Sequence, residues 1–265
     1  MRWIVFFYCV LFCSKLLAAD PDPFEDFAVY GETPSDERYE QNKGRLLFGD
    51  LELGFIVTTG NTNTASAKLK TNIMQDLNNW RNQLKFDSLV KKDNDNDEGD
   101  ELSATRYFTS LQSNYLLEDK NNSLFLYGDY EFDRFSGIEK QASFVAGYGW
   151  RFLENRKDSI DLDVGPGVNY QVSETDESDL GYLLRLALQW ERIVSKRTRF
   201  NQDISAEHSL SGLNSRIKSE TSLVSQISGA LSLKFSYLYR YNTMPEEGKR
   251  NYDAETSATF VFSFN

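Results

Sequence analysis

The chain has 265 residues, a net charge of −11 and a mean hydropathy of −0.52. The acidic excess argues against nucleic acid as a partner, because a phosphate-binding protein needs a basic face. After the N-terminal segment, no run of 18 or more apolar residues is present, so the sequence predicts no membrane-spanning helix. A membrane β-barrel would pass that test, because only every second residue of its strands must be apolar.

The first nineteen residues have the pattern of a signal peptide. Arg2 is the positive start, an apolar stretch covers 3–12, and Ala19 offers a small residue for cleavage. A retained anchor helix is the alternative, although the apolar stretch is short for one. Both cysteines, Cys9 and Cys13, lie in this segment, so the mature chain would have no disulfide. Its removal takes away two positive charges, Arg2 and Lys15, and leaves a net charge of −13.

Residues 20–44 are polar, contain prolines and lack periodicity, which predicts a flexible periplasmic tail. The tail could also fold back as a plug. From about residue 45 to the C-terminus, strand-like segments alternate with polar turns. Twelve strands are expected, near 51–57, 65–77, 80–91, 103–117, 123–135, 140–153, 159–173, 180–194, 198–209, 214–227, 230–243 and 251–265.

The expected strands have one apolar and one polar face. In the last strand Phe260, Phe262 and Phe264 alternate with Thr259, Val261 and Ser263. These segments are longer than most strands of soluble proteins. They are long enough for a tilted membrane strand, which needs about 9–11 residues. The predicted fold is therefore an all-β, transmembrane, antiparallel up-and-down barrel of about 12 strands over 45–265, preceded by the signal peptide (1–19) and the tail (20–44).

Aromatic residues and turn lengths predict the orientation of the barrel in the membrane. With both ends of the barrel in the periplasm, alternate connections would be long and extracellular, and the others tight. Aromatic side chains should then gather near both membrane interfaces. The expected girdle residues are Trp80, Trp150 and Trp190 at the periplasmic side, and Tyr107, Tyr170, Tyr182, Tyr241 and Tyr252 at the outer side.

Three segments resemble the YdiY-like family, described as salt-induced outer-membrane proteins with a domain of unknown function. They are the 59–64 element Thr-Gly-Asn-Thr-Asn-Thr, the 147–150 element Gly-Tyr-Gly-Trp, and the 163–167 element Asp-Val-Gly-Pro-Gly. The resemblance covers about 45–265 and implies an outer-membrane barrel. It brings no activity and no catalytic residues. One departure is that the aromatic Phe264 is followed by Asn265, whereas such barrels usually end on an aromatic residue.

A possible catalytic histidine and a possible calcium loop each have a simpler interpretation. His208 is the only histidine, and a hydrolase could pair it with a serine, but adjacent Ser209 should point to the opposite face. Asp93, Asp95 and Asp97 match the start of a calcium loop, but Glu98 and Ala104 break the pattern. We expect no catalytic site, no cofactor and no metal, with weak cation contact at the acidic loop as the alternative.

Pro166 lies inside a strand between Gly165 and Gly167, which suggests a bulge or bend, or space beside a constriction. Mixed charges are expected to face the lumen, where they would set selectivity in an open channel or pair in a closed one. The expected lumen charges are Asp129, Glu131, Asp161, Asp163, Arg185, Glu191, Asp203, Glu207, Lys234, Arg240, Asp253 and Glu255.

The leading functional hypothesis is a passive conduit for small solutes or ions that favours cations, because acids outnumber bases in that set. A non-conducting structural or adhesive envelope barrel is the alternative, and an outer-membrane hydrolase is a third. The expected partners are outer-membrane lipid, lipopolysaccharide and the machinery that inserts barrels. The sequence leaves the oligomeric state open.

Overall fold

The structure of the chain is a computed structural model. It describes residues 47–59, 64–77, 79–91, 104–119, 121–133, 138–173, 178–245 and 250–264. The expected signal peptide, the expected tail and the acidic loop with Asp93, Asp95 and Asp97 therefore lie outside the described residues. Within the described residues, no helix has the length and apolar character that crossing a membrane requires.

Twelve strands account for nearly all of the described chain. They are β1 (Phe48–Thr59), β2 (Thr64–Leu77), β3 (Trp80–Lys91), β4 (Ala104–Leu116), β5 (Asn122–Asp133), β6 (Ile138–Glu154), β7 (Asp158–Ser173), β8 (Ser178–Ser195), β9 (Thr198–Ser209), β10 (Arg216–Ser228), β11 (Leu231–Asn242) and β12 (Tyr252–Phe264).

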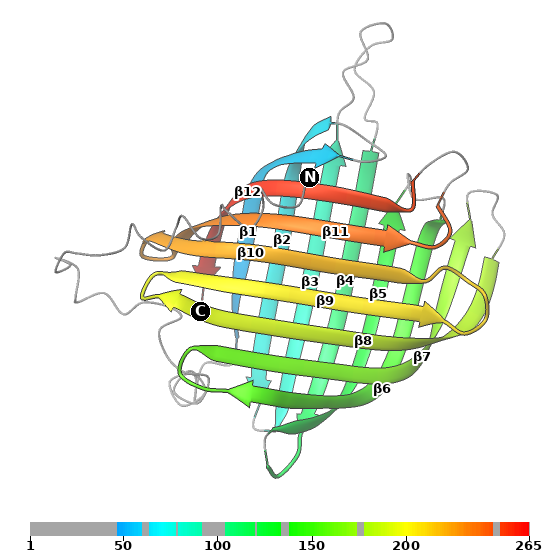
Figure 1. The fold of residues 1–265 in the computed structure, drawn as a ribbon, viewed down its shortest axis with the longest axis horizontal. Coiled ribbons are helices and arrows are strands. Elements are labelled where there is room, and N and C mark those ends of the chain that lie inside the picture. Colours follow the sequence, from blue (N-terminus) through cyan, green and yellow to red (C-terminus); the bar gives the residue numbers. More distant parts are fainter. Residues whose placement is uncertain are drawn as a thin grey trace, which may run out of the picture.

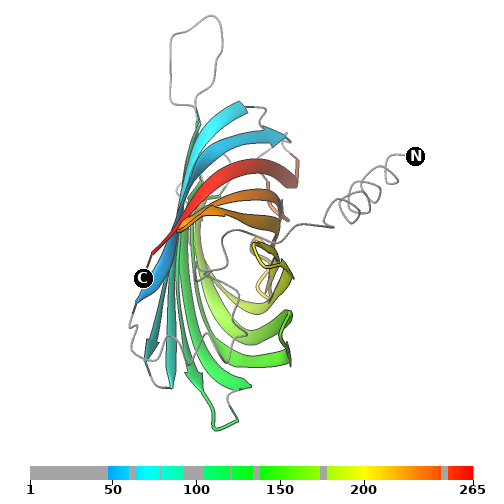
Figure 2. The same ribbon diagram turned by 90° about the vertical axis from the view of Figure 1, so that its left-hand side faces the viewer.

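Each strand pairs antiparallel with its neighbours in sequence, and β1 pairs with β12 to close the sheet. The closing pair runs from Gly49 opposite Phe264 to Thr59 opposite Ala254. In Figure 1 the strands of the near wall, β8 to β11, cross steeply over β2 to β5 of the far wall. Figure 2 shows the same barrel from the side. The prediction of a closed, antiparallel barrel of about twelve strands is confirmed.

Alternation along the strands separates an apolar exterior from a mostly polar lumen. In β8, Leu184 and Leu186 are 44% and 47% exposed on the outside, whereas Leu183 and Arg185, which alternate with them along the strand, are 1% and 6% exposed. In β12, Phe260 and Phe262 are exposed, and Glu255 and Thr259 are buried. A sheet with an apolar outer face and a polar inner face is the pattern of a barrel surrounded by lipid.

The glycines around Pro166 allow two strands to approach closely. A Cβ added to Gly147 would lie 2.7 Å from the Cα of Gly165, and a Cβ added to Gly165 would lie 2.5 Å from the carbonyl oxygen of Ala146. Pro166 brings no N–H to this contact, so it leaves no donor unpaired. The register of β6 and β7 is the same on both sides of the site, from Val145 opposite Gly167 to Tyr148 opposite Val164, so of the expected bulge or bend the bulge is absent. The irregularities lie at Ile138/Lys140 and Arg151/Leu153 instead.

The two ends of the barrel differ. One end, the turn end, carries the short connections at 78–79, 117–121, 155–157, 196–197 and 229–230. The other, the loop end, carries the connections at 60–63, 92–103, 134–137, 174–177, 210–215 and 243–251.

A charge on the lipid-facing side of β8 should be far more costly than the same charge in the lumen. We expect Leu186→Arg, at the centre of the strand, to destabilise the barrel by about 2–4 kcal/mol. Gln189→Arg is the matched control, because Gln189 faces the lumen with Asp161 and Asp203 as its cross-strand partners. It should cost less than about 1 kcal/mol. Refolding titrations into lipid vesicles measure both; equal losses would show that the faces are assigned wrongly.

Candidate functional site

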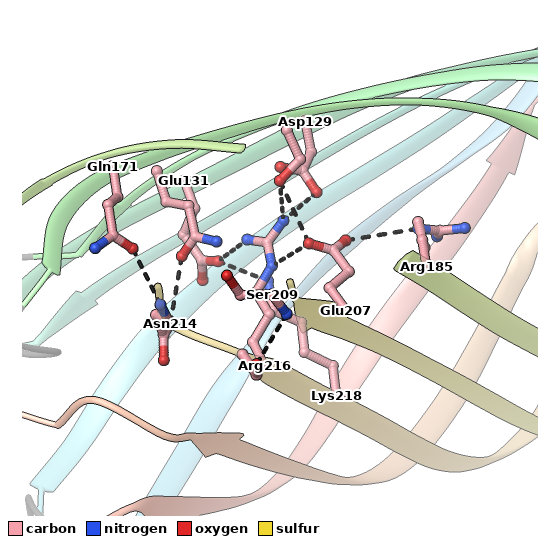
Figure 3. Close-up of polar contacts among 12 residues, drawn as sticks. Asp129, Glu131, Gln171, Arg185, Glu207, Ser209, Asn214, Arg216 and Lys218 are labelled. Carbon is pink, nitrogen blue, oxygen red and sulfur yellow. Dashed lines mark hydrogen bonds and ion pairs between the residues drawn. The ribbon is translucent and has the colours of Figure 1, made fainter. Parts of the chain in front are cut away.

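Arg216 is the centre of a buried charge cluster near the loop end. Its side chain is 4% exposed and reaches three carboxylates: Nε donates to Glu207 (2.8 Å), Nη1 to Glu131 (2.9 Å) and Nη2 to Asp129 (2.5 Å). Figure 3 shows the guanidinium between these carboxylates. Because β10 and β5 are not neighbours in the sheet, the bonds to Asp129 and Glu131 cross the lumen.

Two more basic residues complete this Arg216 cluster. Lys218 donates to Glu131 (2.7 Å) and lies 4.2 Å from the ring centre of Phe108. The guanidinium carbon of Arg185 lies 3.9 Å from the ring centre of Tyr127, and its Nε is 3.6 Å from Glu207. Both are cation–π contacts, in which the ring face attracts the positive charge. The cluster therefore combines paired charges with aromatic packing.

A second cluster, the Glu220 cluster, lies at mid-depth. Glu220 on β10 accepts from Lys70 on β2 (2.7 Å) and from Lys234 on β11 (2.8 Å). Lys234 also donates to Glu52 on β1 (3.0 Å), and Lys70 is 3.7 Å from Asp87 on β3. The pair of Lys70 and Glu220 again joins opposite walls, which are the near and far walls of Figure 1.

A more deeply buried group adjoins the Glu220 cluster. Lys68 pairs with Glu255, and these side chains are 0% and 1% exposed. Arg106 and Arg240 approach the other oxygen of Glu255 at 3.6 and 3.4 Å. Burying an ion is costly unless it is paired and hydrogen-bonded, so this arrangement compensates each buried charge with a close partner.

The connection at 210–215 folds over the loop end of the lumen. Asn214 is 4% exposed, and its Nδ2 donates to Asn242 Oδ1 (3.2 Å). Its Oδ1 accepts from the backbone N–H groups of Thr243 (3.0 Å) and Met244 (3.2 Å). Its own backbone N–H donates to Gln171 on β7 (3.3 Å). Asn214 thus connects β7 with β11. We call the 210–215 connection, which Asn214 holds beside the Arg216 cluster, the roof.

The lumen also contains an apolar cluster and a small polar cavity. Phe125, Tyr127, Val145 and Leu183 are buried together on the inner faces of β5, β6 and β8. A cavity of about 20 Å³ lies at the loop end, lined by residues that include Glu131, Gln141, Asn214, Arg216 and Asp253. That volume suits about one water molecule.

The structure distributes the expected lumen charges over several places. Asp129, Glu131, Arg185 and Glu207 meet in the Arg216 cluster, and Lys234, Arg240 and Glu255 meet at mid-depth. The remaining members are more separate. Asp161 pairs with Arg151 (2.7 Å), Asp163 accepts from Gln112 (2.9 Å), Asp203 lies opposite Glu220, Asp253 lines the cavity, and Glu191 lies opposite Ser159.

The sequence analysis missed several residues that organise these clusters. Lys68, Lys70 and Arg106 lie on strands whose polar faces we did not assign, and Arg216 and Lys218 lie at the start of β10. Alternation was available as a signal, since Lys68 and Lys70 share a face with Asn72. Three lumen acids also lie outside the expected set: Glu52, Asp87 and Glu220.

The aromatic residues occupy both ends. Trp80 and Trp150, each 45% exposed, lie near the turn end, where Trp190 donates to Asp158 (3.2 Å). The expected outer residues lie toward the loop end: Tyr107, Tyr170, Tyr182 and Tyr252 are exposed, and Tyr241 is opposite Tyr252. Trp80 also meets Tyr115 edge-to-face at 5.1 Å between ring centres.

His208 is exposed at the loop end, and the serine that approaches it is Ser215. The distance from His208 Nδ1 to Ser215 Oγ is 3.4 Å, which is longer than the roughly 2.6–3.2 Å expected between a base and its nucleophile. Ser209 is buried in the lumen, where its Oγ accepts from the backbone N–H of Leu213 (3.0 Å). In the described ranges, no group of three or more His, Cys, Asp or Glu residues has the geometry of a metal site.

Comparison with known proteins identifies the family. A profile described as "Protein of unknown function, DUF481" matches residues 51–264. The chain belongs to this family. It is 26% identical over 221 residues to the uncharacterized protein YdiY of Escherichia coli K12, covering 81% of this chain and 82% of YdiY. The resemblance to YdiY-like proteins is therefore confirmed.

A solved porin shares the fold of the DUF481 chain. The NanC porin superposes with a TM-score of 0.55 at 8% identity, covering 81% of this chain and all of NanC. The COG4313 outer-membrane channel of Pseudomonas putida F1 gives a TM-score of 0.46 at 10% identity, covering 93% of this chain and 100% of the channel. At such low identity, the likeness to NanC shows the barrel fold alone.

Removing the arginine at the centre of the Arg216 cluster should strongly destabilise the barrel. In Arg216→Leu, three carboxylates lose their shared cation, and the expected loss is about 3–5 kcal/mol. Lys218→Leu is the control, because Lys218 is 23% exposed and, of these three carboxylates, pairs only with Glu131. This variant should lose about 1 kcal/mol of unfolding free energy. Urea unfolding of protein in lipid vesicles measures both. Equal losses would contradict a central role for Arg216.

Proposed function

We propose that this protein is an outer-membrane barrel that conducts ions and small solutes passively. One observation carries the proposal: charged lumen side chains keep water-accessible surface from the loop end to mid-depth. Lys218 and Glu131 are 23% and 14% exposed, and Glu220 and Lys70 are each 18% exposed. Hydrated charges along a lumen favour the passage of ions, which lose little hydration there.

The width of the lumen limits the solutes. Ion pairs join opposite walls at two depths, through Arg216 with Asp129 and through Lys70 with Glu220. The apolar cluster around Phe125 fills another part of the interior. These contacts support inorganic ions and very small solutes as the transported class, and they argue against large substrates.

The preference for cations remains an expectation from the acidic sequence. The lumen gives it limited support, because the bases Lys68, Lys70, Arg106, Arg216 and Lys218 are each paired with an acid there. Induction by salt is suggested by the family resemblance alone. Measuring transcript and protein levels after an increase in external salt would test it.

Location and partners form part of the same proposal. The exposed apolar belt, with residues such as Leu186, Phe235 and Phe260, supports contact with membrane lipid. We propose export through the N-terminal signal peptide, insertion by the barrel assembly machinery and contact with lipopolysaccharide at the loop end. Cell fractionation with antibody detection tests the location, and recovery of the protein in the inner membrane would contradict it. We propose no enzymatic activity; the contact between His208 Nδ1 and Ser215 Oγ, at 3.4 Å, is long for a base and its nucleophile.

Recording from planar lipid bilayers tests conduction directly. Purified, refolded protein should give small, discrete current steps, with a reversal potential in a KCl gradient that reports cation preference. Barrels refolded and then heat-denatured provide the control. The absence of steps from correctly folded protein would exclude a conduit, and an anion preference would contradict the cation expectation alone.

A non-conducting envelope barrel is the second candidate function. It is favoured by the fully buried pair of Lys68 and Glu255 and by the roof that Asn214 forms at the loop end. Such a barrel would hold its shape through paired charges without a water path. It predicts folded protein that gives no current at any salt concentration.

Removing the contacts of the roof should increase conduction. In Asn214→Ala, the side-chain bond to Gln141 on β6 (3.5 Å) is lost together with those to Asn242, Thr243 and Met244, so the 210–215 connection should leave the mouth more often. We expect a larger single-channel conductance than in the wild type. Ser211→Ala is the control in the same connection, because Ser211 Oγ accepts from the N–H of Tyr182 on the adjacent strand β8 (2.9 Å). Unchanged conductance in Asn214→Ala would contradict an obstructing roof.

A further inference from the structure

One carboxylate at mid-depth is shared by lysines from two walls of the barrel. Glu220 Oε2 accepts from Lys70 (2.7 Å), on the far wall, and Glu220 Oε1 lies 2.8 Å from Lys234, on the neighbouring strand. Both oxygens are therefore engaged by a cation. Lys70 is near the centre of β2, which places this contact well inside the lumen.

The Glu220 cluster is accessible to water, whereas the neighbouring ion pair is not. The side chains of Glu220, Lys70 and Lys234 are 18%, 18% and 14% exposed. Lys68 and Glu255, close by, are 0% and 1% exposed. An ion that crosses this level therefore passes charges of the Glu220 cluster, whereas the buried pair is out of reach.

The local balance of charge depends on Glu220. Without its charge, Lys234 would keep Glu52 at 3.0 Å, and Lys70 would keep only Asp87 at 3.7 Å among its ion pairs in the described chain. Asp203 lies directly opposite Glu220 on β9 and is the further acid at this level. Removing the charge of Glu220 would lower the negative charge at this level by one unit and leave Lys70 without its closest partner.

We propose that Glu220 is the residue that determines the ion selectivity of this barrel, with Lys70 and Lys234 as the opposing charges. The inference rests on the proposed conduit and names the level of the lumen at which cations and anions are distinguished. Charged side chains that line a narrow passage attract the ion of opposite sign and repel the other. A single side chain has a large effect here because the opposing walls are joined at this level.

Reversal potentials in a KCl gradient test this inference on the full chain in planar bilayers. Glu220→Gln keeps the size of the side chain and one of its two acceptor oxygens and removes its charge, so the ratio of K⁺ to Cl⁻ permeability should fall. One unit charge at 4 Å in water changes the local concentration of each ion about fivefold, in opposite directions for K⁺ and Cl⁻, so the ratio should fall by up to about 25-fold. Lys234→Gln should change the ratio in the opposite direction, and Glu220→Asp, which keeps the charge, should stay near the wild type.

Asp76→Asn is the matched control. Asp76 is 16% exposed and pairs with Arg81 at 3.2 Å, but it lies near the turn end of β2 rather than at mid-depth. Its permeability ratio should change less than that of Glu220→Gln. Should Glu220→Gln fail to fold, the opposite change in Lys234→Gln tests the same site.

The outcomes separate this inference from the proposed function. Opposite changes in Glu220→Gln and Lys234→Gln support it. A conducting wild type with the same permeability ratio in both variants would overturn the role of Glu220 and leave the conduit in place. A change in Asp76→Asn as large as that in Glu220→Gln would also overturn it. Folded protein that passes no current in any form would refute the conduit and the inference together.

Discussion

The hydrogen bonds between β1 and β12 are the constraint on which the rest of this structure depends. A sheet with an apolar outer face cannot leave strand edges unpaired in lipid, where no water satisfies the free N–H and C=O groups. The pairing from Gly49 with Phe264 to Thr59 with Ala254 removes both edges. Closure then divides the alternating side chains into an exterior, with Leu186 and Phe260, and a lumen, with Arg185 and Thr259.

Closure also explains the charge pairing. Once the polar faces of opposite walls are brought together, long charged side chains meet across a narrow interior. Arg216 spans the lumen to Asp129 and Glu131, and Lys70 spans it to Glu220. An unpaired charge in these positions would be costly, so pairing and residual hydration are the two ways to accommodate it. The structure uses both, with Lys68 and Glu255 fully buried and the Glu220 cluster still accessible.

Small residues adapt the barrel to these contacts. The missing side chains of Gly147 and Gly165 let β6 and β7 approach closely, and Pro166 can lie in this wall because its absent N–H leaves no unpaired donor. On the neighbouring inner faces, Phe125 and Val145 fill space that charged residues do not occupy. The interior therefore has an apolar part beside β5 and β6 and charged parts toward β2 and β10.

The sequence by itself determined the fold class, the twelve strands and most of their limits, because a two-residue period needs no tertiary information. The ends expected for 80–91 and 198–209 agree with β3 and β9, and the first strand, expected at 51–57, extends over Phe48–Thr59. Alternation also carries the inward direction of residues such as Asp129 and Glu255. It gives no distances, however, and it does not say which residues meet across the lumen.

Only the tertiary structure decided the partners. Lys70 and Glu220 are 150 positions apart in the chain, and their contact depends on the register of every strand between them and on closure. The roof by Asn214 and the continuous register at Pro166 depend likewise on how neighbouring strands approach one another. These features escape sequence reasoning because alternation describes one strand at a time, whereas the candidate site is built by strands from opposite walls.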